Sequence, residues 1–126
     1  MKVQYLTPEA PDIRRELATN HRLLGAILAE AGNFQAAQTE FKASASFYSA
    51  LLRREPKNAL WYRDLGVSLV NSGLMLEKLG DRQGACKEYV ESVNSARTAA
   101  ELDQRWSDLL KETEDKEKAL TCSGGK

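Results

Sequence analysis

The sequence has few of the features that mark a catalytic, nucleic-acid-binding or membrane-spanning chain. Its 126 residues include one histidine, two cysteines and three prolines, and its 18 basic and 18 acidic residues cancel. Nucleic-acid binders usually carry an excess of Lys and Arg, because neutralised phosphates supply much of their affinity. No apolar run approaches the roughly 20 residues of a membrane helix. We therefore expect neither a nucleic-acid partner nor a membrane partner.

The cysteines and the histidine are too scattered to predict a site of chemistry. Cys86 and Cys122 have neither metal-ligand spacing nor a nearby histidine, and the first residues lack the apolar stretch of a signal peptide. We expect reduced thiols, with Cys86 on a helix and Cys122 in a tail, and a cytoplasmic location. No acid, base and nucleophile are fixed around His21, so we predict no enzyme activity, no metal and no cofactor.

The sequence does contain an internal repeat with a period of 48 residues. Residues 15–44 align with residues 63–92 without a gap, and nine positions are identical, among them Gly25/Gly73, Gly32/Gly80 and Ala37/Ala85. Phe41 and Tyr89 form one of the conservative pairs. A gapless match of this density predicts one supersecondary unit that is used twice.

Each unit is predicted to be a helix, a tight turn and a second helix. Apolar residues recur at three- and four-residue steps, as helices require. Gly32 and Gly80 suit the position after a helix end, where the backbone turns left-handed. Asn33, Asn58 and Asp81 suit the cap of a following helix. The predicted helices span 9–31, 34–54, 58–79, 82–102 and about 104–120.

These elements predict a single helical domain over residues 1–126. A first hairpin covers 12–56 and a second covers 57–102. The segment 104–120 is predicted to be a capping helix, because its last turns are polar nearly all round. Residues 121–126 are predicted to be a flexible tail. Trp61 and Trp106 each lead into a helix and are expected to pack at the junctions between elements.

The repeated motif resembles the tetratricopeptide repeat (TPR), whose pattern is Leu-Gly-x2-Tyr followed by Ala-x3-Phe. The first unit has Leu24-Gly25-x2-Leu28 and Ala37-x3-Phe41; the second has Ser72-Gly73-x2-Leu76 and Ala85-x3-Tyr89. The unit is longer than the 34 residues of the family, and the family's closing Pro is missing at Ser49 and Arg97. An extra heptad in each helix would lengthen it without turning its apolar side away. The chain thus looks like the long-helix repeats of bacterial proteins.

The resemblance implies an all-α fold, in which antiparallel hairpins stack as a short right-handed α-solenoid of two repeats plus a capping helix. Gly25 and Gly73 are then expected where two helices meet closely, with Phe41 and Tyr89 as the large side chains of the contact. We interpret the glycine spacing as a packing pattern and not as a chemical site.

The resemblance also implies a function. TPR-type scaffolds bind a peptide or protein partner through the concave face formed by the first helix of each repeat. An alternative is structural self-association, as a homodimer, through the same face. Carried over position by position, this face comprises Thr19, Arg22, Leu23, Ala26 and Glu30 in the first unit, and Val67, Val70, Asn71, Leu74 and Lys78 in the second.

Overall fold

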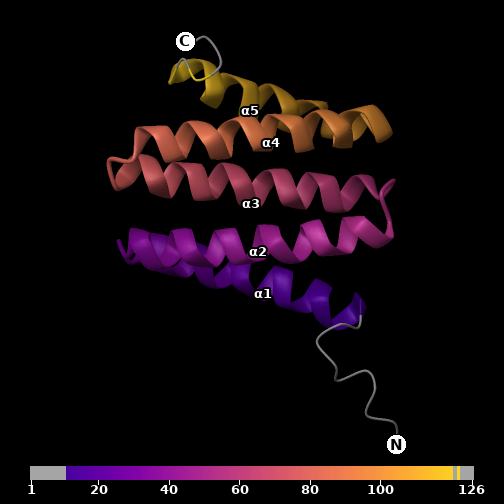
Figure 1. Ribbon diagram of the computed structural model, residues 1–126, viewed down its shortest axis with the longest axis horizontal. Coiled ribbons are helices and arrows are strands. Elements are labelled where there is room, and N and C mark those ends of the chain that lie inside the picture. Colours follow the sequence, from indigo (N-terminus) through magenta and orange to yellow (C-terminus); the bar gives the residue numbers. More distant parts are fainter. Residues whose placement is uncertain (1–10, 121, 123–126) are drawn as a thin grey trace, which may run out of the picture.

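The computed structural model describes residues 11–120 and Cys122, and within them the regular secondary structure is entirely helical. The elements in chain order are α1 (Pro11–Glu30), α2 (Phe34–Arg54), α3 (Ala59–Lys78), α4 (Arg82–Leu102), the short 3₁₀ helix η2 (Gln104–Trp106) and α5 (Ser107–Ala119). Figure 1 shows the helices stacked in chain order, with α1 and α5 at the two edges. The all-α prediction is confirmed, and the predicted spans 34–54 and 82–102 are confirmed to the residue.

The turns inside the two hairpins have the geometry that their sequences predict. Gly32 and Gly80 have φ values of +84° and +83°, in the left-handed region that favours glycine. The N–H of Asn33 donates to the carbonyl of Leu28 at 2.9 Å, and the N–H of Asp81 donates to the carbonyl of Leu76 at 2.8 Å. Each turn therefore closes its helix with the six-to-one hydrogen bond of a Schellman motif.

The same residues begin the next helix. The Asn33 side chain accepts a hydrogen bond from the N–H of Ala36, and Asp81 accepts one from the N–H of Gly84. Asn58 caps α3 by accepting from the N–H of Trp61 at 3.1 Å. These caps satisfy N–H groups that have no partner inside the helix, so the three predicted caps are confirmed. The predicted fifth helix begins three residues late, because Asp103 first caps the η2 turn.

Each hairpin closes where an aromatic ring of its second helix lies against a glycine of its first helix. A Cβ atom added at Gly25 would lie 2.9 Å from the ring of Phe41, and one added at Gly73 would lie 2.5 Å from the ring of Tyr89. Tyr89 is fully buried and Phe41 is 3% exposed. The expected contact between glycine and large side chain is therefore confirmed in both units.

The α2–α3 interface contains serine side chains as well as apolar ones. Ser44 Oγ donates to the carbonyl of Ala18 at 2.8 Å and lies 3.0 Å from Ser68 Oγ. Gln38 Nε2 donates to Ser72 Oγ at 3.0 Å. Because these groups are small and hydrogen-bonded, they let the helices approach without leaving a buried polar atom unsatisfied.

The tryptophans lie at the junctions, as expected. Trp61 is 9% exposed and packs in a cluster with Ala18, Tyr48 and Leu51, which joins the two hairpins. Trp106 is half-buried, and the guanidinium groups of Arg63 and Arg105 lie 4.7 Å and 5.3 Å from its rings. Both distances are within the range of cation–π attraction.

Cys86 and Cys122 form a disulfide, with their Cα atoms 5.2 Å apart. The expectation of two reduced thiols is therefore wrong, and Cys122 is tied to α4 although the segment 121–126 was predicted to be a flexible tail. The other residues of that segment lie outside the described part of the chain. Disulfides persist mainly in oxidising compartments, so the cysteines no longer argue for a cytoplasmic location. That location stays a prediction.

The glycine contacts generate a stability prediction. Gly73→Ala should lower the free energy of unfolding by about 1–3 kcal/mol, because the new methyl group overlaps the Tyr89 ring. Gly66→Ala in the same helix is the matched control. Its Cβ would lie 3.5 Å from the carbonyl oxygen of Ser92, an ordinary contact, so better helix propensity should leave it neutral or more stable by up to about 1 kcal/mol. Urea denaturation measures both; equal effects would exclude a specific contact at Gly73.

Candidate interaction surfaces

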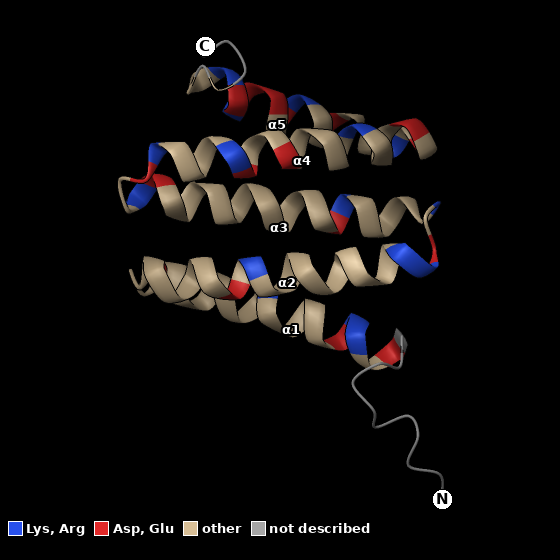
Figure 2. Cartoon of the chain, viewed as in Figure 1, with Lys and Arg blue, Asp and Glu red and all other residues tan. Residues whose placement is uncertain are grey.

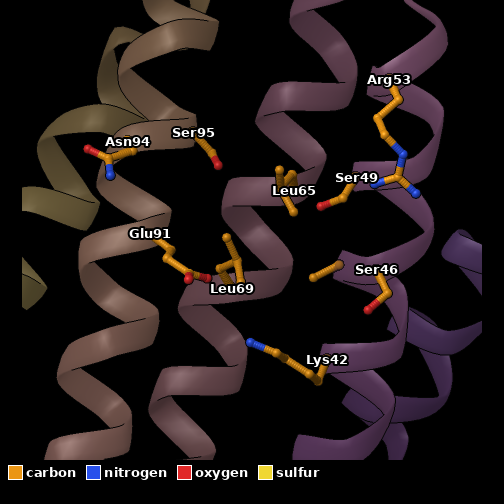
Figure 3. A pocket seen from close by; sticks show the side chains of 10 residues that line it. Lys42, Ser46, Ser49, Arg53, Leu65, Leu69, Glu91, Asn94 and Ser95 are labelled. Carbon is orange, nitrogen blue, oxygen red and sulfur yellow. The ribbon is translucent and has the colours of Figure 1, made fainter. Parts of the chain in front are cut away.

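The middle helix, α3, packs against α2 on one side and α4 on the other, as Figures 1 and 3 show. Two sides of α3 therefore face away from both neighbours. Residues two positions apart on a helix are separated by about 200°, so Leu65 and Leu69 lie on one of these sides while Val67 and Asn71 lie on the other. The structure thus offers two candidate surfaces, which we name the α1–α3 face and the α2–α4 groove.

The α1–α3 face is the set of ten residues that the TPR resemblance predicts. On α1, Leu23, Ala26 and Glu30 are exposed, and Thr19 and Arg22 are half-buried. On α3, Lys78 is exposed, with its Nζ 5.7 Å from the ring of Phe34, while Val67, Asn71 and Leu74 are half-buried.

Val70 does not line the α1–α3 face. It is 4% exposed and packs in a core cluster with Ala85 and Tyr89. Leu74 packs on the same cluster from the outside. The TPR resemblance predicts that Val70 faces a partner. In the structure Val70 faces α4 instead, because it lies three residues before Gly73 and therefore on the same side of α3. The role of the other nine residues in binding stays a prediction.

A buried carboxylate, Asp64, lies on α3 within electrostatic range of Arg22 on α1. Arg63 Nε lies 2.8 Å from Asp64 Oδ1 and forms an ion pair with it. The angle of the contact does not meet the geometry of a hydrogen bond. Burial raises the pKa of Asp64 above its ordinary value of 3.8, against the opposing effects of the Arg63 and Arg22 charges and of a hydrogen bond from Tyr48. Arg22 is thus partly engaged inside the protein.

The α2–α4 groove lies on the opposite side of α3 and has a volume of about 520 Å³. Figure 3 shows Leu65 and Leu69 of α3 between the walls formed by the two flanking helices. The α2 wall presents Lys42, Ser46, Ser49 and Arg53, and the α4 wall presents Glu91, Asn94 and Ser95. The groove therefore has polar walls and an apolar floor that is only partly open, since Leu65 is half-buried and Leu69 is 4% exposed.

The two walls of the groove are tied together by one ion pair. Lys42 Nζ on α2 lies 2.7 Å from Glu88 Oε2 on α4, and the Glu88 side chain is only 5% exposed. The equivalent residue of the first repeat, Glu40, also accepts from a basic residue, because its Oε1 lies 2.5 Å from His21 Nδ1. The repeated glutamate thus pairs with a basic residue of another helix in both units, on α1 for Glu40 and on α2 for Glu88.

Two further charges of the groove have no ion-pair partner within residues 11–120. Arg53 on the α2 wall and Glu91 on the α4 wall are both exposed. A charged side chain that is exposed beside an apolar floor is free to pair with a ligand of opposite charge. This arrangement is suited to binding a chain that carries charge of both signs.

Sequence reasoning missed the groove, because the resemblance directed attention to the first helix of each repeat. A signal was present in the small polar residues of the second helices. Ser46 and Ser49 on α2, and Ser95 on α4, leave space between the walls that larger side chains would fill.

His21, the one histidine of the sequence, packs between side chains of α2. His21 is stacked on Phe47, with ring centroids 5.5 Å apart, in addition to its contact with Glu40. Among the described residues, no group of three or more His, Cys, Asp or Glu side chains could hold a metal ion. No helix of the described chain is long and apolar enough to cross a membrane. The expectation that the chain is not an enzyme stays a prediction.

Comparison of the chain with protein-family models, curated proteins and solved structures finds no match. The resemblance of the repeated residues to the TPR pattern therefore stays a prediction.

The buried carboxyl of Asp64 generates a prediction about pH. A carboxyl whose pKa is raised on folding binds more protons in the folded than in the unfolded state, so its contribution to stability falls as pH rises through the interval above 3.8. Asp64→Asn keeps the size of the side chain and removes this titration. Urea denaturation should show that wild type gains stability relative to Asp64→Asn when the pH is lowered from about 6 to about 3. A difference that is constant, or that changes in the opposite direction, would contradict the assignment.

Proposed function

We propose that the chain is a protein-interaction module of TPR type that binds a peptide helix of its partner in the α2–α4 groove. The observation that carries the proposal is a pair of exposed charges, Arg53 and Glu91, that have no ion-pair partner within residues 11–120 and lie on opposite walls of the groove. The proposal includes the right-handed solenoid and the scaffold role expected from the repeat, and it places the binding surface on the opposite side of α3 from the predicted face.

The size and shape of the groove support a helical ligand. Its volume of about 520 Å³ lies within the range of 300–1,000 Å³ that is usual for binding pockets. Leu65 and Leu69 are four residues apart on α3, so they form an apolar strip that runs along the helix axis. An amphipathic helix can lay its apolar side along such a strip, which is a recurring mode of peptide recognition.

The charges of the walls define the chemistry of the partner. A peptide helix with leucines on one side, acidic residues along one edge of that side and basic residues along the other would pair with Arg53 and Glu91 simultaneously. Such pairs at the rim of an interface contribute more to selectivity than to total affinity. We therefore expect the groove to select for a peptide with edges of opposite charge.

One observation favours a second candidate function, which is self-association. Leu23, Leu24 and Ile27 on α1 are 53%, 44% and 63% exposed and are contiguous on the outer side of this edge helix. Contiguous apolar side chains on a surface commonly mark a contact between proteins. A homodimer formed through α1 would cover them and would leave the α2–α4 groove open.

The first experiment is a titration of ¹⁵N-labelled protein with amphipathic peptides of about 14 residues whose leucine stripe is flanked by Glu and Lys, by Glu only, or by Lys only. Wild type should bind the Glu/Lys peptide most tightly, with chemical-shift changes at Ser46, Ser49 and Asn94. In Arg53→Glu the charges on both walls that lack an ion-pair partner within residues 11–120 are acidic, so the preference should move to the Lys-only peptide by about fivefold. Arg54→Glu changes the neighbouring exposed arginine, which does not line the groove, and should keep the wild-type preference.

The outcomes of this titration separate the alternatives. Shifts confined to Ala26 and Asn71 would place the site on the α1–α3 face and overturn the groove. An unchanged preference in Arg53→Glu would also contradict the groove. Sedimentation equilibrium of the protein without peptide tests self-association, which requires a dimer that Leu23→Glu with Ile27→Glu converts to a monomer.

A further inference from the structure

The disulfide occupies a particular place in the α4–α5 hairpin. The chain leaves α4 at Leu102, turns through η2 and returns along α4 as α5. Cys122 lies just beyond the end of α5, and Cys86 lies in the second turn of α4. The bond therefore closes the open end of this hairpin, at the far end from its turn.

Two polar contacts that join α4 to α5 and to its C-terminal end lie at the surface. Arg97 Nη2 lies 3.7 Å from Glu114 Oε2, and both side chains are more than a third exposed. Arg82 Nη2 donates to the carbonyl of Leu120 at 2.9 Å at the exposed end of the helix. Thr113 is fully buried, but its hydroxyl donates to the carbonyl of Leu110 within α5 itself.

The outer side of α5 is strongly polar. Lys111, Glu112, Asp115 and Lys118 are all exposed, and Figure 2 shows acidic and basic residues side by side along this helix. A helix with one apolar side and so polar an outer side gains burial only on its inner side, where it packs on α4 and where Leu109 lies beside Gly66 of α3. Its attachment therefore depends on these contacts and on the disulfide.

The remaining helices have cores that do not include α5. The clusters around Trp61 and around Phe41 are built from α1, α2 and α3. Among the core clusters of the described residues, that of Val70, Ala85 and Tyr89 receives residues from beyond α4, namely Leu120 and Cys122. We therefore expect that α5 can separate locally while α1 to α4 stay folded. Local opening of this kind occurs in many proteins.

We propose that the Cys86–Cys122 disulfide is a reducible latch that holds α5 on α4. Both cysteines are half-buried, so a small dithiol can reach the bond. A thiolate of the dithiol attacks one sulfur and displaces the other as a thiolate, forming a mixed disulfide; its second thiol then releases the protein. The two protein cysteines gain two electrons and two protons, and the dithiol becomes a cyclic disulfide.

Opening the latch uncovers one side of α4. Cys86, Val93 and Arg97 lie at steps of seven and four residues, which places them on the same side of this helix. Val93 is only 4% exposed when α5 is in place. The oxidation state of the cysteine pair thus determines whether the stack ends in a polar cap or in an open helix with apolar residues. No α5 residue lines the α2–α4 groove, so the latch and the proposed function can fail independently.

The test is amide hydrogen exchange of the full chain with and without dithiothreitol, with mass spectrometry to count free thiols. In the reduced protein, amides of residues 107–119 should exchange at least about tenfold faster, while those of α2 and α3 keep their rates. Cys122→Ser should exchange like the reduced wild type before dithiothreitol is added and should not respond to it. This variant separates the effect of the bond from other effects of the reductant.

Three results would overturn the latch. The first is equal protection of α5 in oxidised and fully reduced protein. The second is loss of protection throughout α1 to α4 on reduction, which would make the bond a support of the whole fold. The third is a protein with two free thiols after purification under oxidising conditions.

Discussion

The contact between an aromatic ring and a glycine, made once in each hairpin, is the constraint on which the rest of the structure depends. Gly25 and Gly73 have no side chain, so the rings of Phe41 and Tyr89 lie directly against the backbone of the facing helix. The hydroxyl of Tyr89 reaches the edge of the core and donates to Glu77 Oε1 at 2.5 Å. Burial, together with the Glu77 carboxylate, raises the pKa of Tyr89, which keeps the phenol protonated where it must donate.

The close approach of the helices determines where open surface remains. Because α3 is held against α4 by Gly73 and against α2 by Ser68 and Ser72, its other two sides face outward. On one of these sides the serines of the walls leave the α2–α4 groove open. On the other side, Val67, Asn71 and Leu74 are half-buried. The groove is therefore a consequence of packing in the two hairpins and needs no separate element to build it.

Local signals and the repeat allowed most of the fold to be predicted. The positive φ of Gly32 and Gly80 and the caps at Asn33 and Asp81 are decided by the residues themselves, and the 48-residue period located the glycine contacts. The Cys86–Cys122 bond could not be predicted, because two cysteines far apart in sequence carry no periodic signal. The burial of Val70 and the position of the groove depend on which side of α3 each neighbour covers, and a family pattern does not contain that information.

The most direct test of this account is a double-mutant cycle in the first hairpin, with Gly25→Ala and Phe41→Leu measured singly and together by urea denaturation. A Cβ at Gly25 would lie 2.9 Å from the Phe41 ring, so Gly25→Ala should destabilise the wild-type protein. Leucine removes the ring, and in that background the same change should be neutral or favourable, because alanine is a better helix former than glycine. The account predicts a coupling free energy of at least about 1 kcal/mol between the two sites. An equal cost for Gly25→Ala in both backgrounds would show that the ring does not rest on the glycine, and would contradict the account.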